Sequence, residues 1–210
     1  MSFNRSGLPG WTYNNEELFE LESVNIFKKN WQLTCHESDL PEVGDYITYD
    51  MLGERALLVR GQDKQVRAFH NLCRHRGSRL VVGERGNCKN VITCPFHAWV
   101  YNLDGTLRGP SRSETFPSID RNEWGLKPIE LDKFMGFYFV RFQPSNYPKA
   151  SDILERHKDK FELYHTDNII SASKISLSES LPINWKTVRD VDNEGYHVAQ
   201  AHPGLHYLYG

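Results

Sequence analysis

Two short segments of this sequence carry the same pair of metal-binding side chains. Cys73-Arg74-His75 is a C-x-H segment, and Cys94-Pro95-Phe96-His97 is a C-x2-H segment that begins after a spacer of eighteen residues. In each segment, the cysteine and the histidine leave one tight turn in the same direction. We therefore expect two loops that close on one metal centre from either side and supply it with two thiolates and two imidazoles.

Two kinds of metal centre use this set of donors. In a [2Fe-2S] cluster of the mixed type, two cysteines hold one iron and two histidines hold the other. A structural zinc ion accepts the same four ligands, but zinc sequences usually keep Cys with Cys and His with His. Each loop here is mixed. The pattern therefore favours a cluster held by Cys73, His75, Cys94 and His97 over zinc, and over a purely structural role for these residues.

The residues around both segments extend this pattern. C-R-H-R-G-S-R-L and C-P-F-H-A-W-V-Y-N-L-D-G resemble the two cluster-binding boxes of Rieske proteins, and more closely those of the Rieske non-haem iron oxygenases. Gly77, Pro95 and Gly105 suit the turns that such loops need. The resemblance implies a Rieske [2Fe-2S] cluster on a small antiparallel β domain.

A second group of reactive side chains lies near the end of the sequence. Asn184-Trp185-Lys186 predicts the start of a helix that carries Glu194 and His197, with His202 and Pro203 behind them. Glu194 and His197 are three residues apart and share a helix face, whereas His202 would lie about 140° further round an unbroken helix. His202 can join the group only if the helix ends first, and Pro203 favours such an end.

The segment N-W-K-T-V-R-D-V-D-N-E-G-Y-H-V-A-Q-A-H-P-G-L resembles the catalytic motif of Rieske oxygenase α subunits. The resemblance implies that His197 and His202 bind a mononuclear iron(II), as part of a two-His, one-carboxylate triad with open positions for dioxygen. Glu194 matches the carboxylate that links this iron to a cluster histidine of an adjacent subunit. Most ring-hydroxylating members have aspartate there, and glutamate is more typical of the branch that acts on quaternary ammonium compounds such as carnitine.

Taken together, the resemblance implies the terminal oxygenase component of a Rieske-type mono- or dioxygenase. A partner reductase or ferredoxin would supply electrons, ultimately from NAD(P)H, and the cluster would pass them to the iron that activates O2. The implied reaction is hydroxylation or demethylation of a small organic substrate. We expect a quaternary amine, with aromatic ring oxidation as the alternative, and a homotrimer for the full-length protein. A simple Rieske electron carrier is a further alternative, but it has no use for the Glu194, His197 and His202 group.

The third ligand of the mononuclear iron, a carboxylate in this family, is supplied much further along than Gly210. We therefore expect a truncated α subunit that holds the mononuclear iron weakly and is inactive alone.

The fold class expected from the sequence is α+β. An N-terminal helical segment over 1–40 precedes a Rieske domain over 41–145, and residues 146–210 begin a truncated α/β, helix-grip-like catalytic domain. The pattern of apolar residues and of turn residues predicts each element. Helices are expected over 15–31 and 152–164, strands over 45–51, 54–61, 64–71, 135–142 and 171–179, and a hairpin over 98–108.

Charge and cysteine content limit the binding partners and the cellular compartment that we expect. A formal net charge of -2 gives no overall drive toward nucleic acid or an anionic membrane. The first residues lack the apolar core of a signal peptide and no long apolar run occurs, and Cys35 and Cys88 are expected as free thiols, so we expect a cytoplasmic protein. One local exception is a basic stretch near the loops, which would either steer an acidic electron donor or simply be solvated: Arg74, Arg76, Arg79, Arg85 and Lys89.

Overall fold

The computed structural model describes residues 7–116, 119–121, 123–170 and 181–205. The chain divides into two compact units. Ser23–Lys174 form the larger unit, and the smaller unit combines Met1–Glu22 with Ile175–Gly210. The structure thus divides the predicted N-terminal segment after residue 22 and assigns its first part to the same unit as the C-terminal residues. In the described part of the chain, no helix is long and apolar enough to cross a membrane.

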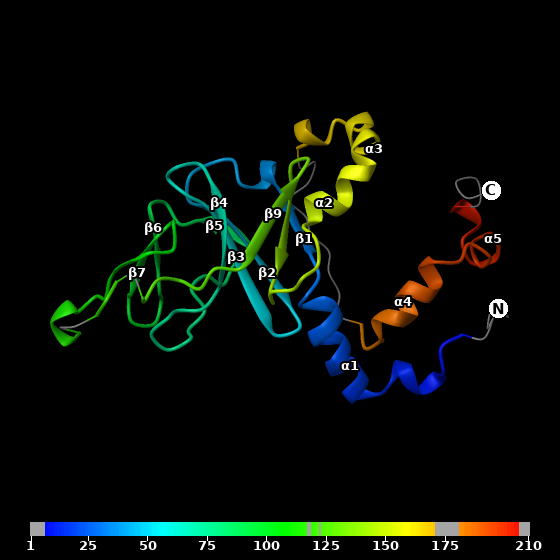
Figure 1. Cartoon of the computed structure of the whole chain (residues 1–210), viewed down its shortest axis with the longest axis horizontal. Coiled ribbons are helices and arrows are strands. Elements are labelled where there is room, and N and C mark those ends of the chain that lie inside the picture. Colours follow the sequence, from blue (N-terminus) through cyan, green and yellow to red (C-terminus); the bar gives the residue numbers. More distant parts are fainter. Residues whose placement is uncertain (1–6, 117–118, 122, 171–180, 206–210) are drawn as a thin grey trace. The chain divides into compact units, whose positions relative to one another are not determined.

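The larger unit contains three antiparallel sheets (Figure 1). The first has the order β4-β3-β2-β5 and holds the three strands predicted between residues 45 and 71. Its β2–β3 hairpin turns at Leu52 and Gly53, whose φ angles of 47° and 81° suit the two-residue turns that match strand twist. The strands are β2 (Asp45–Met51), β3 (Glu54–Arg60), β4 (Val66–His70) and β5 (Arg85–Asn87).

The other two sheets have three strands each. One has the order β1-β10-β9 and comprises β1 (Gln32–His36), β9 (Glu130–Phe134) and β10 (Phe137–Arg141). The last has the order β6-β7-β8 and comprises β6 (Val91–Thr93), β7 (Val100–Asn102) and β8 (Leu107–Gly109). The predicted hairpin over 98–108 and the predicted strand over 135–142 are both present. The expected α+β class with a small antiparallel β domain is confirmed.

Strand β3 is buried on both faces and separates two cores. Leu57 and Val59 point to one side and pack with Cys73 and Cys94, whereas Ala56 and Leu58 belong to the core on the other side. Because successive strand residues alternate between faces, a central strand buried on both faces is apolar without interruption. This placement explains the continuous apolar run in the sequence E-R-A-L-L-V-R.

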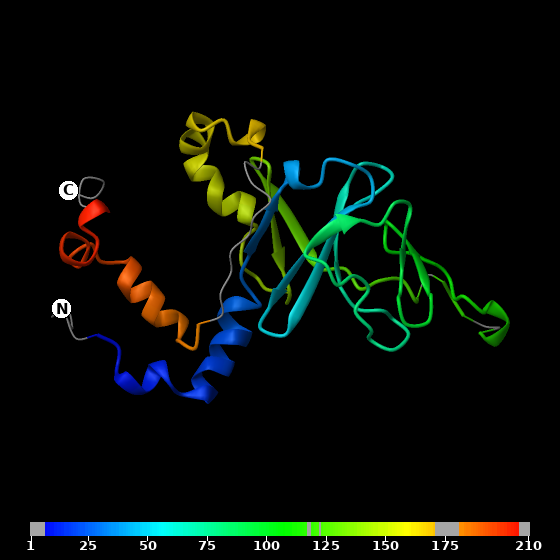
Figure 2. The same cartoon turned by 180° about the vertical axis from the view of Figure 1, so that it is seen from behind.

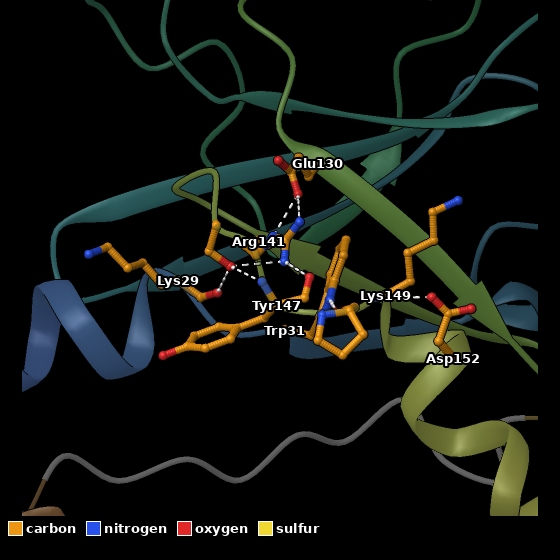
Figure 3. A network of polar contacts seen from close by, with 9 residues as sticks. Lys29, Trp31, Glu130, Arg141, Tyr147, Lys149 and Asp152 are labelled. Carbon is orange, nitrogen blue, oxygen red and sulfur yellow. Dashed lines mark hydrogen bonds and ion pairs between the residues drawn. The ribbon is translucent and has the colours of Figure 1, made fainter.

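A polar network fastens the end of β10 to the residues that follow it (Figure 3). The Arg141 guanidinium is buried, donates from Nε to Glu130 at 2.6 Å and from one terminal nitrogen to the Tyr147 carbonyl at 3.0 Å, and lies 4.5 Å from the centre of the Trp31 ring. The Trp31 indole in turn donates to the Pro148 carbonyl at 2.9 Å. These contacts fix where the chain leaves the sheet and enters α2.

The helices are shorter than the sequence predicts. The helix expected over 15–31 is α1 (Glu16–Glu22), which Asn15 caps by accepting from the Leu18 amide at 2.7 Å, followed by a π-helical turn over Ser23–Phe27. The helix expected over 152–164 is divided into α2 (Ala150–Leu154) and α3 (Lys158–Leu163). The strand predicted over 171–179 lies outside the described residues.

Two helices follow in the smaller unit, α4 (Trp185–Asp192) and α5 (Val198–Ala201). As predicted, Asn184 caps α4, since its side chain accepts from the Lys186 amide at 3.0 Å. The expectation that this helix continues through Glu194 and His197 is wrong. The Glu194 side chain accepts from the Tyr196 and His197 amides, which replaces the helical hydrogen bonds there, and glycine follows at position 195.

Candidate metal centres

The two predicted cluster loops have the same backbone hydrogen bonds. The Cys73 amide donates to the Ser78 carbonyl at 2.8 Å and its carbonyl accepts from Gly77 at 2.9 Å. The Cys94 amide donates to the Trp99 carbonyl at 2.8 Å and its carbonyl accepts from Ala98 at 3.0 Å. Each turn therefore closes on itself, and in each the fourth residue after the cysteine has a positive φ, 65° at Gly77 and 52° at Ala98.

The loops bring their donors together as two pairs. The thiols of Cys73 and Cys94 are both buried, at 4% and 2% exposure, and they interact electrostatically with each other. The imidazole rings of His75 and His97 lie with centroids 4.7 Å apart. All four cysteines of the chain are free thiols, as expected for Cys35 and Cys88. The predicted cluster residues thus come together as one pair of thiols and one pair of imidazoles.

The chemistry of these donors fits a two-iron cluster. Among the residues that the structure describes, no three His, Cys, Asp or Glu side chains gather as they would around a single ion, either at these loops or around His197 and His202. A pair of thiols and a pair of imidazoles are the donors of a centre with one iron for the thiolates and one for the imidazoles. In addition, the Nδ1 atom of His75 and the Nε atom of Arg74 are buried without a hydrogen-bond partner. Such atoms normally have partners, so their lack of one in this loop is what a ligand-binding site requires.

Burial prepares the first histidine for metal binding. Its desolvation, with further contributions from His97 and Arg76, lowers the pKa of His75, which favours the neutral imidazole. The His75 ring also stacks on Trp99, with centroids 5.0 Å apart and planes 3° from parallel. Trp99 is itself 1% exposed, so the imidazole packs against a side chain that the core holds in place.

The second predicted group lies where α4 and α5 meet. His197 precedes α5 and His202 ends it, and their ring centroids are 5.4 Å apart. The helix does end before His202, as the grouping required. The Nδ1 atom of His197 is hydrogen-bonded to Glu194 Oε1, and this hydrogen bond is the largest effect that lowers the pKa of the Glu194 carboxyl. A carboxylate on Nδ1 leaves Nε2 as the nitrogen that is available to a metal.

This group lines a hollow of about 550 Å³ within the smaller unit. Glu194, His197 and His202 provide its polar side, together with Asp192. Its apolar side is aliphatic: Ile183, Val188, Val191, Val198 and Leu205. The hollow therefore combines carboxylates and imidazoles with an aliphatic wall, a composition typical of small-molecule sites.

Known proteins share sequence with both the cluster loops and the histidine group. The family model described as the Rieske [2Fe-2S] domain matches residues 30–120, which include both loops. The chain carries a Rieske domain. It is 38% identical over 200 residues to the carnitine monooxygenase oxygenase subunit of Escherichia coli (strain K12), covering 94% of this chain and 52% of that protein. It is 36% identical over 198 residues to the glycine betaine monooxygenase oxygenase subunit of Pseudomonas aeruginosa (strain UCBPP-PA14), covering 94% and 45%.

Solved structures agree with the sequence comparison. The crystal structure of the quaternary ammonium Rieske monooxygenase CntA with L-carnitine superposes with a TM-score of 0.85 at 34% identity, and the match covers 94% of this chain and 55% of that one. The homology therefore includes the smaller unit as well as the Rieske domain. This chain spans about half the length of the relatives that it matches. Resemblance to the Rieske non-haem iron oxygenases is thus confirmed.

Some residues at the Rieske domain's cluster site escape sequence reasoning. The Tyr101 hydroxyl lies 3.2 Å from Cys73 Sγ and accepts from the Arg74 amide at 3.1 Å. No local spacing links Tyr101 to Cys73, because β7 brings them together from 28 residues apart. In the basic stretch, Arg79 forms an ion pair with Asp50 at 2.5 Å, and the exposed Arg85 forms one with Asp39 at 3.5 Å. Arg76 and Lys89 are exposed as well.

Proposed function

We propose that this chain is part of the terminal oxygenase subunit of a Rieske monooxygenase that oxidises a small quaternary amine. The observation that carries the proposal is the paired arrangement of Cys73, Cys94, His75 and His97 on two matching closed loops. In this proposal the four residues hold the [2Fe-2S] cluster. His197 and His202 hold a mononuclear iron, and Glu194 is the carboxylate that links the two centres.

When bound, the cluster supplies single electrons and the mononuclear iron supplies dioxygen activation. The protein's own residues have simpler tasks. Glu194 fixes the tautomer and orientation of His197, because the carboxylate accepts from Nδ1 and leaves Nε2 for the metal. Trp99 and the closed turns hold His75 still. Burial of both cysteines keeps water from the sulfur side of the cluster.

The hollow at the histidine group supports a cationic substrate. A quaternary ammonium group has a permanent positive charge and apolar methyl groups, and no N–H to donate. It therefore needs aliphatic contacts and nearby negative charge rather than hydrogen-bond acceptors. Val188 and Val191 offer the first, and Glu194 and Asp192 offer the second. The relatives named for carnitine and glycine betaine oxidation support the same substrate class.

An electron donor is part of the proposal, since the cluster must be reduced for each turnover. Phe96 lies between the ligand positions of the second loop and is 61% exposed, and Arg76 is exposed beside the first loop. An exposed apolar side chain on one loop and an exposed arginine on the other suit an acidic ferredoxin or reductase, whose approach the positive charge would steer. We further propose that the full-length subunit assembles as a homotrimer.

The decisive test is dioxygen uptake by the full-length subunit with a reductase, using carnitine, glycine betaine and benzoate as substrates. We expect uptake coupled to product formation with at least one amine. Uptake with benzoate alone would replace the quaternary amine by an aromatic substrate. A protein that accepts electrons but consumes no dioxygen with any substrate would be a carrier, and the oxygenase proposal would be wrong.

A further inference from the structure

The smaller unit contains a buried ion pair between its two sequence-distant parts. Lys186, in the first turn of α4, donates from Nζ to both carboxylate oxygens of Glu22, at 2.7 Å each, and Glu22 is the last residue of α1. The indole Nε1 of Trp185 donates to the same carboxylate at 2.8 Å. The side chains of Lys186 and Glu22 are only 7% and 10% exposed. Both oxygens of the Glu22 carboxylate thus accept hydrogen bonds from donors on α4.

A buried ion pair is a poor source of net stability, because removing two charges from water costs about as much as their attraction returns. Apolar residues of similar volume often serve stability as well or better. A buried pair is, however, satisfied only in one arrangement of its two elements, and its best-documented role is to fix register. We therefore expect Glu22 to determine the position and rotation of α4 more than the net stability of the fold.

A second contact holds the other end of α4 to the same N-terminal residues. The Tyr13 hydroxyl donates to Asp190, which lies four residues after Lys186 and therefore on the same face of the helix. Val188 and Val191 lie on other faces and line the hollow that contains the histidine group. The N-terminal segment and α4 run side by side in both views (Figures 1 and 2). One face of α4 is therefore anchored and another forms the site.

We infer that Glu22 is a positioning residue for the metal-binding histidines, an inference that rests on the function proposed above. It sets the rotation and axial position of α4 through Lys186 and Trp185. The chain then leaves α4 at Asn193 and reaches Glu194 and His197 within four residues, so a shift of the helix moves both side chains. Residues 1–22, which precede the Rieske domain in the sequence, thus belong to the same unit as the histidine group.

The test measures iron(II) affinity of the full-length, cluster-loaded subunit, after a chelator has removed the mononuclear iron. The variant is Glu22→Gln, and the matched control is Glu20→Gln, an exposed glutamate on the same helix. We expect iron(II) binding to weaken by about tenfold, the size of effect seen when support for a metal ligand is lost. The control should bind as the wild type does, and the visible spectrum of the cluster should be the same in all three.

A second variant separates positioning from stability. In Glu22→Met/Lys186→Met the buried charges are replaced together, so the protein should unfold at a temperature no lower than the single variant does. If the pair fixes position, iron(II) affinity stays reduced in this double variant. Wild-type affinity in either variant would overturn the inference and leave the proposed function intact. A wild-type subunit that binds no iron beyond its cluster would overturn both.

Discussion

The cluster loops and the histidine group of the smaller unit are built in opposite ways. Cys73 and Cys94 are almost fully buried in turns that close on themselves, whereas the side chain of Glu194 is 46% exposed and that of His197 is 29% exposed. The loops owe their shape to hydrogen bonds within a few residues and to a packed core below them. The histidine group owes its shape to one side-chain pair and to where two short helices end. A site of the first kind is preformed, whereas a site of the second kind depends on support from elsewhere, and here Glu22 is the candidate.

The largest expected effect tests whether the loops act as one unit. Cys94→Ala removes one of two thiolates from the sulfur side, and we expect complete loss of cluster iron and acid-labile sulfide. Cys88→Ala is the matched control, because Cys88 is a half-buried free thiol that packs beside the same core. Iron and sulfide analysis of both purified variants decides the matter. A coloured Cys94→Ala protein with full iron content would show that the donor pairs are misassigned.

The second prediction tests whether the two centres are independent in structure. His197→Ala removes an iron ligand from the smaller unit, so substrate-dependent dioxygen uptake should fall by at least about 100-fold, the upper range for loss of a supporting residue. The visible spectrum of the cluster should not change, since its donors lie in the other unit. His157→Ala, near the start of α3, is the control. Retained uptake in His197→Ala would exclude this residue as a ligand.

The third prediction concerns pH and the Glu22 pair. Burial raises the pKa of the Glu22 carboxyl. The hydrogen bonds from Lys186 and Trp185 and the charge of Lys186 together lower it by more, so the pKa lies below its ordinary value. A carboxyl with a lowered folded-state pKa stabilises the fold fully above its unfolded-state pKa and loses this effect as the pH falls through the folded-state pKa.

Glu22→Gln should therefore cost about 3 kcal/mol of unfolding free energy at pH 7, since it leaves Lys186 buried without its counter-charge. The difference between wild type and variant should shrink as the pH falls below the ordinary glutamate pKa of about 4.3 and through the lower folded-state pKa of Glu22. Denaturant unfolding of wild type and variant at pH 7 and at acidic pH measures this difference in unfolding free energy. A difference that is the same at both values would show that the charge on Glu22 is not what matters.

The smallest effect concerns the cluster potential. The Tyr101 hydroxyl can donate to Cys73 Sγ at 3.2 Å, and a hydrogen bond to a cluster sulfur stabilises the more negative, reduced state. Tyr101→Phe should lower the reduction potential by about 60 mV, which corresponds to about 1.4 kcal/mol for one electron. Tyr138→Phe, in the other core, is the control. An unchanged potential in Tyr101→Phe would rule out this hydrogen bond as an influence on the cluster.

The contrast between the two sites also explains what the sequence can predict. The four cluster donors follow from spacing because each loop is a local turn, and β2, β3 and β4 follow from short apolar runs between glycines. Ala98 is less evident, since a positive φ at alanine has no compositional signal, unlike Gly77 at the equivalent place. Strand β1 lies in the segment that the sequence predicts to be helical, because nothing near it in sequence signals its pairing with β10, about a hundred residues away.

Long-range pairs are also what limited prediction at the second site. The motif predicts the histidine group, but the helix expected through it is too long, because Glu194 accepts hydrogen bonds from the backbone where the helix would continue. Lys186 was recognised only as a residue near a helix start. Nothing in the sequence near residue 22 indicates that Glu22 meets Lys186, 164 positions later. Contacts of this kind become visible only when the chain is folded.

The most direct measurement is metal and sulfide analysis of the purified protein together with its absorption spectrum. If the paired thiols and imidazoles hold a [2Fe-2S] cluster, the protein will be red-brown and contain acid-labile sulfide, with iron at no less than two atoms for every two sulfides. Both should disappear in Cys94→Ala. A colourless protein with one zinc ion per chain and no sulfide would contradict the assignment of the loops, and with it the redox function.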